Sequence, residues 1–251
     1  MRARADGRGE AEVVLFVGPT MATSPRARAL ARRLTKRPPA RRSDVARWID
    51  AHDAPGVIAI VDGVFHDTLA VGHAEIRDAI GRGFRVWGLS SMGAIRAREM
   101  APLGMRGFGR VFERFEREPD FQDDEVALLH EPTPPYRALT EPLVHLRVAI
   151  DHLVARGLVG EPDAAVVLVD LKSRWYGDRT RRRAIEALAR AASGPGGAGA
   201  VRDELRAFDR FAIKTLDLER FLEERPWAEE PRGRPAPRAR KTDDRVAVDM
   251  K

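Results

Sequence analysis

The chain has 251 residues, of which 43% are hydrophobic, enough for one substantial core or for a core domain with a helical appendage. It carries a formal net charge of +6 and no cysteine, and no apolar run approaches the roughly 18 to 20 residues of a membrane helix. These properties exclude disulfides, thiolate metal sites and sulfur relay through a thiol of this chain, and they predict a cytoplasmic protein.

The positive charge is concentrated near the N-terminus. Residues 1–47 contain 12 Lys or Arg against 4 Asp or Glu, an excess of 8 that is larger than the net charge of the whole chain, +6. A basic arm can bind nucleic acid or an acidic protein. The chain also uses Arg far more often than Lys, which arginine-rich codon usage would produce as well. Since no recognised nucleic-acid-binding module accompanies the charge, we rank nucleic-acid binding last.

Strand and helix patterns alternate through the first hundred residues. Strands are predicted over 12–20, 56–65 and 85–89, and helices over 24–37, 44–52, 73–84 and 92–101. The run 56–65 is the strongest strand pattern and is stopped by Asp62 and Gly63, while Ser24 is a predicted N-cap. This alternation predicts parallel βαβ units, with a small sheet between flanking helices in a Rossmann-like three-layer α/β core.

The character of the sequence changes after about residue 105. A glycine-broken and then acidic stretch leads to a convincing helix over 139–159. Further helical patterns lie near 161–171, 178–193 and 199–224, with a Gly-rich interruption at 193–200. We therefore expect four parts, namely a basic arm (1–11), an α/β core (12–155), a helical region (156–226) and a disordered tail (227–251).

Two polar pairs follow strand ends, where ligands bind in folds of this class. They are Asp62–Gly63 and Ser90–Ser91. A strand, a tight turn and a helix would lift a serine into the open and aim helix N-terminal amides at it, as in nucleophile elbows. An ordinary helix N-cap explains the same pattern, and the pattern alone favours the cap.

A serine nucleophile needs a base, and His73 is the candidate because it follows the Asp62 strand end and is expected to meet Ser91 at the same sheet edge. The acids Asp123, Asp124 and Glu125 are read first as caps of a helix beginning near Val126, and otherwise as Mg²⁺ ligands or a partner surface. No transition-metal spacing or phosphate loop is present in the sequence, so we expect no metal and no cofactor.

Several motifs together resemble the TfuA-like family. They are VLFVGPT, RPPARRSD, IVDGVFHDTLAVGHAEI, VWGLSSMGAIRAREMAPLGMRGFGRVF and DDEVALLH, in this order over residues 13–150. Ala74 and Arg98 depart from the family pattern as we would write it, which puts local partner contacts in doubt. The five residues SSMGA are also similar to the nucleophile segment of Clp proteases, in which the serine before Met-Gly is catalytic. That similarity selects Ser91 over Ser90.

The resemblance implies a role beside YcaO proteins in backbone thioamidation of ribosomal peptides and some proteins. It implies hydrolysis of the terminal thioacid of a thiocarboxylated ThiS-like carrier, which supplies sulfide. In this hypothesis Ser91 is the nucleophile, His73 the base, and Asp62 or Glu75 orients the imidazole. The substrate-binding residues would be the amides of Met92 and Gly93, with Gly63, and Arg96 as a carboxylate ligand. The alternative is a non-catalytic adaptor or allosteric activator that recruits YcaO and its peptide substrate.

Overall fold

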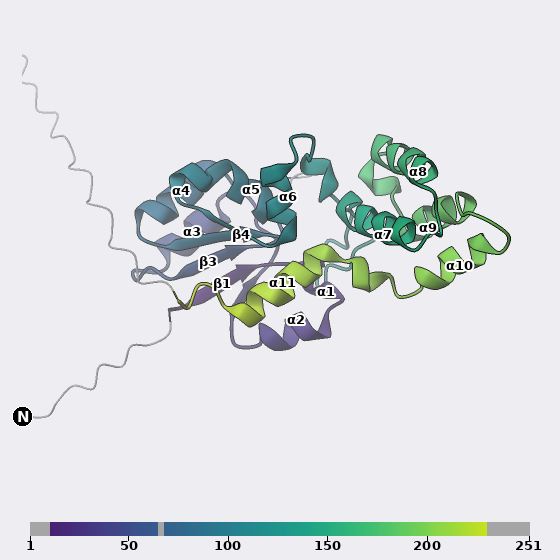
Figure 1. Ribbon diagram of the computed structural model, residues 1–251. Helices are drawn as coiled ribbons and strands as arrows, with labels where there is room; N and C mark the ends of the chain where they lie inside the picture. The colour runs from purple at the N-terminus through teal and green to yellow at the C-terminus, as the bar shows by residue number, and fades with distance from the viewer. Residues whose placement is uncertain (1–10, 65–67, 230–251) are drawn as a thin grey trace, which may run out of the picture.

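The computed structural model describes residues 11–64 and 68–229 (Figure 1). The predicted N-terminal arm, apart from Ala11, and the predicted tail beyond Glu229 lie outside the described residues. Within the part described, no helix is both long and apolar enough to cross a membrane.

A five-stranded parallel sheet forms the centre of the fold, in the order β2-β1-β3-β4-β5. The strands are β1 (Val13–Phe16), β2 (Thr35–Arg37), β3 (Val57–Ile60), β4 (Arg85–Leu89) and β5 (Arg106–Phe108). The predicted α/β class is confirmed. The two outer strands, β2 and β5, were not predicted, because each has only three residues and none of them is fully buried.

The helices flank the sheet and continue beyond it. They are α1 (Pro19–Ala22), α2 (Pro25–Leu30), α3 (Asp44–Asp50), α4 (His73–Gly81), α5 (Met92–Met100), α6 (Arg110–Arg117), α7 (Leu143–Ala155), α8 (Glu161–Ser173), α9 (Arg181–Arg190), α10 (Gly197–Glu204) and α11 (Ile213–Glu224). Ser24 caps α2 as predicted, since its hydroxyl oxygen accepts the amide of Ala27 over 2.9 Å. The helical pattern 199–224 is divided by a short 3₁₀ helix, Phe208–Phe211.

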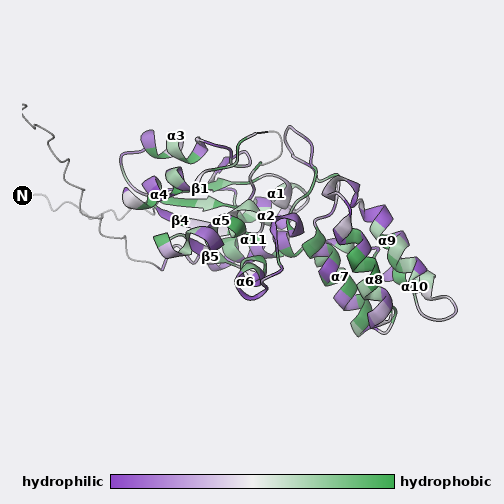
Figure 2. Ribbon diagram, turned by 90° about the horizontal axis from the view of Figure 1, so that it is seen from above, coloured by the Kyte–Doolittle hydropathy of each residue, from purple (hydrophilic) through white to green (hydrophobic). Residues whose placement is uncertain are grey.

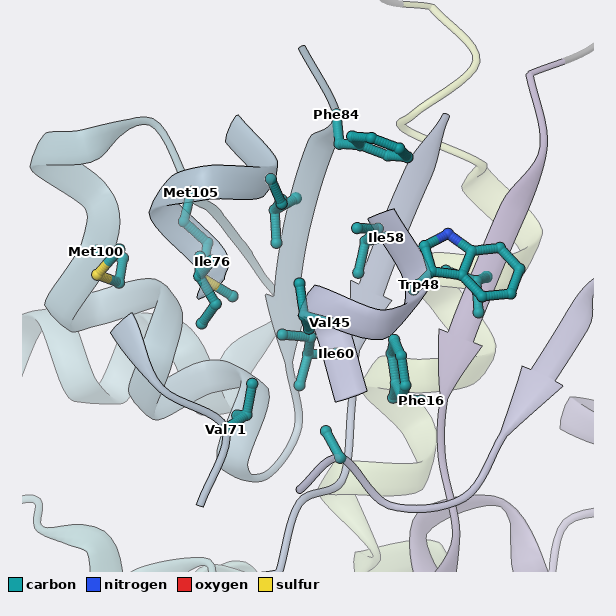
Figure 3. Close-up of a cluster of buried hydrophobic side chains, with 14 of the residues drawn as sticks. Phe16, Val45, Trp48, Ile58, Ile60, Val71, Ile76, Phe84, Met100 and Met105 are labelled. Carbon is teal, nitrogen blue, oxygen red and sulfur yellow. The ribbon is translucent and has the colours of Figure 1, made fainter. Parts of the chain in front are cut away.

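Both faces of the sheet are buried because alternate residues of each strand point to opposite sides. Val14, Ile58 and Val86 belong to the core under α3, α4 and α5, which Figure 3 shows in close-up. Their neighbours Leu15 and Ala59 belong to the opposite core, which α2 and α11 cover. The result is the three-layer arrangement that the alternating sequence predicted.

The helices α7 to α10 lie to one side of the sheet and have a hydrophobic cluster of their own (Figures 1 and 2). The chain then returns, and α11 lies against the sheet with Leu218 and Phe221 in its core. A further cluster, which includes Ile95, Val144 and Ile213, joins α5, α7 and α11. The chain after residue 156 therefore contributes both to the helical part and to the core of the sheet.

Candidate functional site

A pocket of about 170 Å³ lies beyond the carboxyl ends of the central strands. The sheet order changes direction between β1 and β3, and ligands bind at such switch points in open parallel sheets. The pocket is lined by Pro19, Pro39, Arg41, Asp62, Gly63, Val64, Thr68, Ser91, residues 126–130, Pro132, Tyr136, Tyr176 and Lys214. It therefore contains both of the polar strand ends that the sequence singled out, together with a lysine that it did not.

Asp62 forms the floor between two strand ends. Its carboxylate accepts the backbone amides of Gly18 over 2.8 Å and Thr20 over 3.0 Å, and the hydroxyl of Thr20 over 2.6 Å. The side chain is almost fully buried. These three bonds tie the end of β3 to the start of α1, which follows β1. Asp62 thus shapes the pocket rather than orienting an imidazole.

The serine turn is strained at Ser90. This residue has a φ of +63°, and the amide of Ser91 donates to the carbonyl oxygen of Leu89 over 2.7 Å, which closes a γ-turn around Ser90. Such turns with a positive φ are rare and strained. Ser90 is fully buried, and its hydroxyl donates to the carbonyl oxygen of Lys214 over 2.8 Å. Its hydroxyl is therefore occupied in holding the turn to α11.

Ser91 stands at the N-cap position of α5, yet its side chain makes no capping hydrogen bond. It lines the pocket instead. The helix can begin so close to the sheet because residue 93 is glycine, where an added Cβ would lie 1.7 Å from the carbonyl oxygen of Ile60. Ser91 therefore lines the pocket and does not fill the side-chain capping role at the start of α5.

Of the two amides proposed for an oxyanion hole, one is already engaged. The amide of Gly93 donates to the carbonyl oxygen of Val61 over 3.3 Å. The amide of Met92 remains the candidate donor at the start of α5. Gly63 lines the pocket beside the start of α5, since an added Cβ there would lie 2.6 Å from the side chain of Met92.

Lys214 is the titratable residue that sequence reasoning missed. It lies at the second position of α11, only 1% exposed, and its ammonium donates to the carbonyl oxygen of Val126 over 3.0 Å. Burial lowers its pKa to about 8, although the charges of Asp62 and Glu141 act against this shift. The sequence does contain a hint of this buried lysine. Lys214 directly follows an apolar run (Phe211 to Ile213) and is one of only five lysines among the 44 basic residues.

A buried polar chain holds the backbone of Lys214. Its amide donates to Nε2 of His145 over 3.4 Å, which assigns the imidazole hydrogen to Nδ1, 3.1 Å from the carboxylate of Glu141. Burial lowers the pKa of His145. Burial alone would raise the pKa of Glu141, but His145 and Arg181 hold it below its usual value. His145 is therefore a neutral structural residue that positions the start of α11.

The structure does not bring His73 into the pocket. Its Nε2 lies 2.7 Å from a carboxylate oxygen of Glu99, and its side chain is 55% exposed. Arg96 contacts the same carboxylate over 2.6 Å and donates to the carbonyl oxygen of Val71 over 2.9 Å. His73 and Arg96 therefore form an ionic cluster between α4 and α5, and neither lines the pocket.

Glu75, the second carboxylate proposed to orient His73, has a different role. It accepts the amide of Gly72 over 2.7 Å and the amides of Ser43 and Val45 over 3.1 and 3.0 Å. One carboxylate thus satisfies the N-terminal amides of both α3 and α4. Glu75 is a double cap, so the predicted pairing with His73 is absent among these contacts.

The three acids at 123–125 join the α/β core to the helical part. They form a 3₁₀ helix and cap no helix at Val126, because the chain is irregular there and α7 begins only at Leu143. Glu125 is fully buried in a bidentate pair with Arg147, and Asp124 pairs with Arg179 over 3.1 Å. Burial raises the pKa of Asp123. These pairs fix the segment 126–130 that forms one wall of the pocket.

Residues 62–180 match the family model described as TfuA-like protein. The chain therefore contains a TfuA-like domain. The matched range contains the serine turn and the wall at 126–130, whereas Lys214 lies beyond it. No match to this TfuA-like chain was found among curated proteins.

Proposed function

We propose that this TfuA-like protein hydrolyses the C-terminal thioacid of a thiocarboxylated, ThiS-like sulfur carrier and so supplies sulfide to a YcaO partner for backbone thioamidation of a ribosomal precursor peptide or a protein. The proposal joins the general association of the family with YcaO proteins to the geometry of the pocket. The observation that carries it is the Ser91 side chain, which leaves its helix uncapped and lines a pocket at the switch point of the sheet.

The reaction suits the chain's chemistry. A thioacid is an acyl group, so attack by a serine hydroxyl on its carbonyl carbon is acyl transfer, with sulfide as the leaving group. A chain without cysteine cannot carry the sulfur on a thiol of its own. Hydrolysis needs only a hydroxyl, a base, donors for the oxyanion and water, all of which a small pocket with a few polar groups can supply.

The shape of the site suits a chain terminus. A cavity of about 170 Å³ is far too small for a folded protein, but it accepts the last residues of an extended tail. A neighbouring groove shares Pro39, Arg41 and Tyr136 with the pocket and continues toward Arg37 and Arg47. Arginines along this path would attract a tail that ends in an anionic thiocarboxylate.

An adaptor or allosteric activator of YcaO is the second candidate. The observation in its favour is an apolar strip on the outer side of α8, where Val166 and Val169 are 70% and 68% exposed. Exposed apolar surface of this kind is typical of protein interfaces. In this case the Ser91 side chain would have no chemical role, and the protein would act by binding alone.

The deciding experiment measures sulfide release from a thiocarboxylated ThiS-type protein. We expect release by the wild type and loss in Ser91→Ala, with Ser173→Ala as the matched control, because Ser173 is an exposed serine that does not line the pocket. All three proteins must show the same cooperative unfolding. Wild type that releases no sulfide, or equal release by Ser91→Ala, would reject the hydrolase. YcaO-dependent thioamidation that survives in Ser91→Ala would then favour the adaptor.

A further inference from the structure

We propose that Lys214 is the general base that activates Ser91, so that the site is a serine–lysine pair rather than a serine–histidine pair. The inference rests on the proposed function, since it names the base of that same reaction. It replaces His73, which lies outside the pocket and is paired with Glu99.

The first argument is placement. Ser91 and Lys214 line the same pocket, and the two segments that carry them are joined by the bond from the Ser90 hydroxyl to the Lys214 carbonyl oxygen. The backbone of Lys214 is held from its other side by His145. A base must keep its position relative to the nucleophile, and these two bonds hold the backbone of Lys214 in place beside the serine turn.

The second argument is the state of the amine. Lys214 is one of the largest fully buried side chains, and it has no salt bridge within 4.0 Å among the described residues. Its only hydrogen-bond acceptor in the part of the chain described is the carbonyl oxygen of Val126. An ammonium so poorly compensated loses its proton readily, which is how enzymes prepare a lysine base. The pKa of about 8 agrees with this geometry.

The charged and titratable groups around Lys214 set how strongly it holds its proton. Asp62 and Glu141 stabilise the ammonium, and buried His145 is neutral. The other titratable groups that line the pocket are Arg41, His130, Tyr136 and Tyr176. His130 is the rival base among them. Its Nδ1 lies 2.7 Å from the carbonyl oxygen of Glu131, so Nε2 would be its accepting nitrogen.

The proposed steps conserve atoms and charge. Neutral Lys214 takes the hydroxyl proton of Ser91 as Oγ bonds to the thiocarboxylate carbon. The C–S bond then breaks, and the Lys214 ammonium gives its proton to the departing sulfur, which leaves as HS⁻. Water next attacks the seryl ester while Lys214 takes one of its protons. That proton passes to Oγ of Ser91, and the carrier leaves as an ordinary carboxylate, with one proton released to solvent.

The test is the pH dependence of sulfide release from a thiocarboxylated ThiS-type carrier. We expect the rate for wild type to rise through an apparent pKa near 8, and the rate for Lys214→Met to fall at least about 100-fold, as expected for loss of a general base. Lys36→Met is the matched control, because Lys36 lies on the exposed strand β2 and hydrogen-bonds only to carbonyl oxygens of the neighbouring turn among the described residues.

A second variant separates chemistry from structure. Because the chain has no cysteine, Lys214→Cys carries a single thiol that 2-bromoethylamine converts to aminoethylcysteine in denaturant before refolding. This amine is more acidic than that of lysine, so recovered activity with the pH profile moved to lower pH would support the base. A residue with a purely structural role would not move the profile. The wild-type profile remains decisive if this derivative does not refold.

Other outcomes overturn the inference. A wild-type profile with a limb near 6.5 that disappears in His130→Ala or His73→Ala would assign the base to that histidine. Activity of Lys214→Met within tenfold of wild type would also exclude Lys214. In both cases loss in Ser91→Ala would preserve the hydrolase. Wild type without sulfide release would reject the function and the base together.

Discussion

The hydroxyl of Ser90 donates a hydrogen bond to the carbonyl oxygen of Lys214 across 124 residues of sequence. Ser90 is fully buried and has a positive φ, so this bond holds a strained turn in place. The bond connects the serine turn of the α/β core to α11, which arrives from the helical part of the chain. The position of Ser91 relative to Lys214 therefore depends on the hydrogen bond that Ser90 makes.

We expect Ser90→Ala to destabilise the protein by about 0.5–1.5 kcal/mol, because it removes a buried hydrogen bond to the Lys214 carbonyl group in the first turn of α11. Sulfide release should fall as well, although Ser91 is intact. Urea unfolding measures the first effect. Ser173→Ala is the control, since that hydroxyl also donates to a carbonyl over 2.8 Å but on the surface. Equal losses in the two variants would contradict the prediction.

Gly93→Ala should destabilise the protein by about 1–3 kcal/mol or more, since the added Cβ would lie 1.7 Å from the carbonyl oxygen of Ile60. The start of α5 must then move away from β3, and Ser91 moves with it. Gly81→Ala provides the contrast. An added Cβ at Gly81 meets nothing within 4 Å, so this variant should gain up to about 1 kcal/mol. Thermal unfolding of both variants checks the difference.

Lys214→Met should change how stability depends on pH. The pKa of Lys214 is lowered from 10.5 to about 8, so between these values the unfolded chain binds more protons and the wild type gains stability as pH rises. This gain is about 3 kcal/mol in total. The variant lacks it. The difference in free energy of unfolding between variant and wild type should therefore move in favour of wild type from below pH 8 to above pH 10.5.

Asp217 provides a second pH-dependent group, with the opposite slope. Burial raises its pKa from 3.8 to about 6, although it accepts the amide of Val111 over 2.9 Å. The folded protein then binds more protons between these values, so its free energy of unfolding falls as pH rises from about 4 to about 6.

Asp217→Asn should remove that decline, which is about 3 kcal/mol in size, when unfolding in urea is compared at several pH values. Asp203→Asn is the control, because Asp203 is a 69% exposed acid on α10. If wild type and Asp217→Asn lose stability in parallel over this interval, Asp217 is not the responsible group.

The strands that the sequence predicted are those with fully buried side chains, such as Ile58 and Ile60 in β3. Short apolar runs rich in β-branched residues are typical of strands that are buried on both faces. The edge strand β2 reads Thr-Lys-Arg, and its pairing with β1 is a backbone property that side-chain patterns do not reveal. The fold class could thus be predicted from the central strands, but the number of strands in the sheet could not.

The site was predictable only in part. Strand ends located Asp62 and Ser91, because parallel strands bring their carboxyl ends to one edge. His73 follows the same strand end in sequence, but it lies 11 positions beyond Asp62, at the start of α4, where it contacts Glu99 instead. Lys214 arrives from a helix at the far end of the chain. No local pattern encodes that contact.

The return of α11 to the sheet also sets an order in time. A ribosome makes Ser91 long before it makes Lys214, and the hydrogen bond that holds the serine turn has no acceptor until residue 214 has emerged. A nascent chain that has already folded its sheet therefore lacks the side of the pocket that Lys214 contributes. Under the proposed mechanism the complete site exists only when nearly the whole described chain has been synthesised, so a chain that ends before Lys214 should release no sulfide.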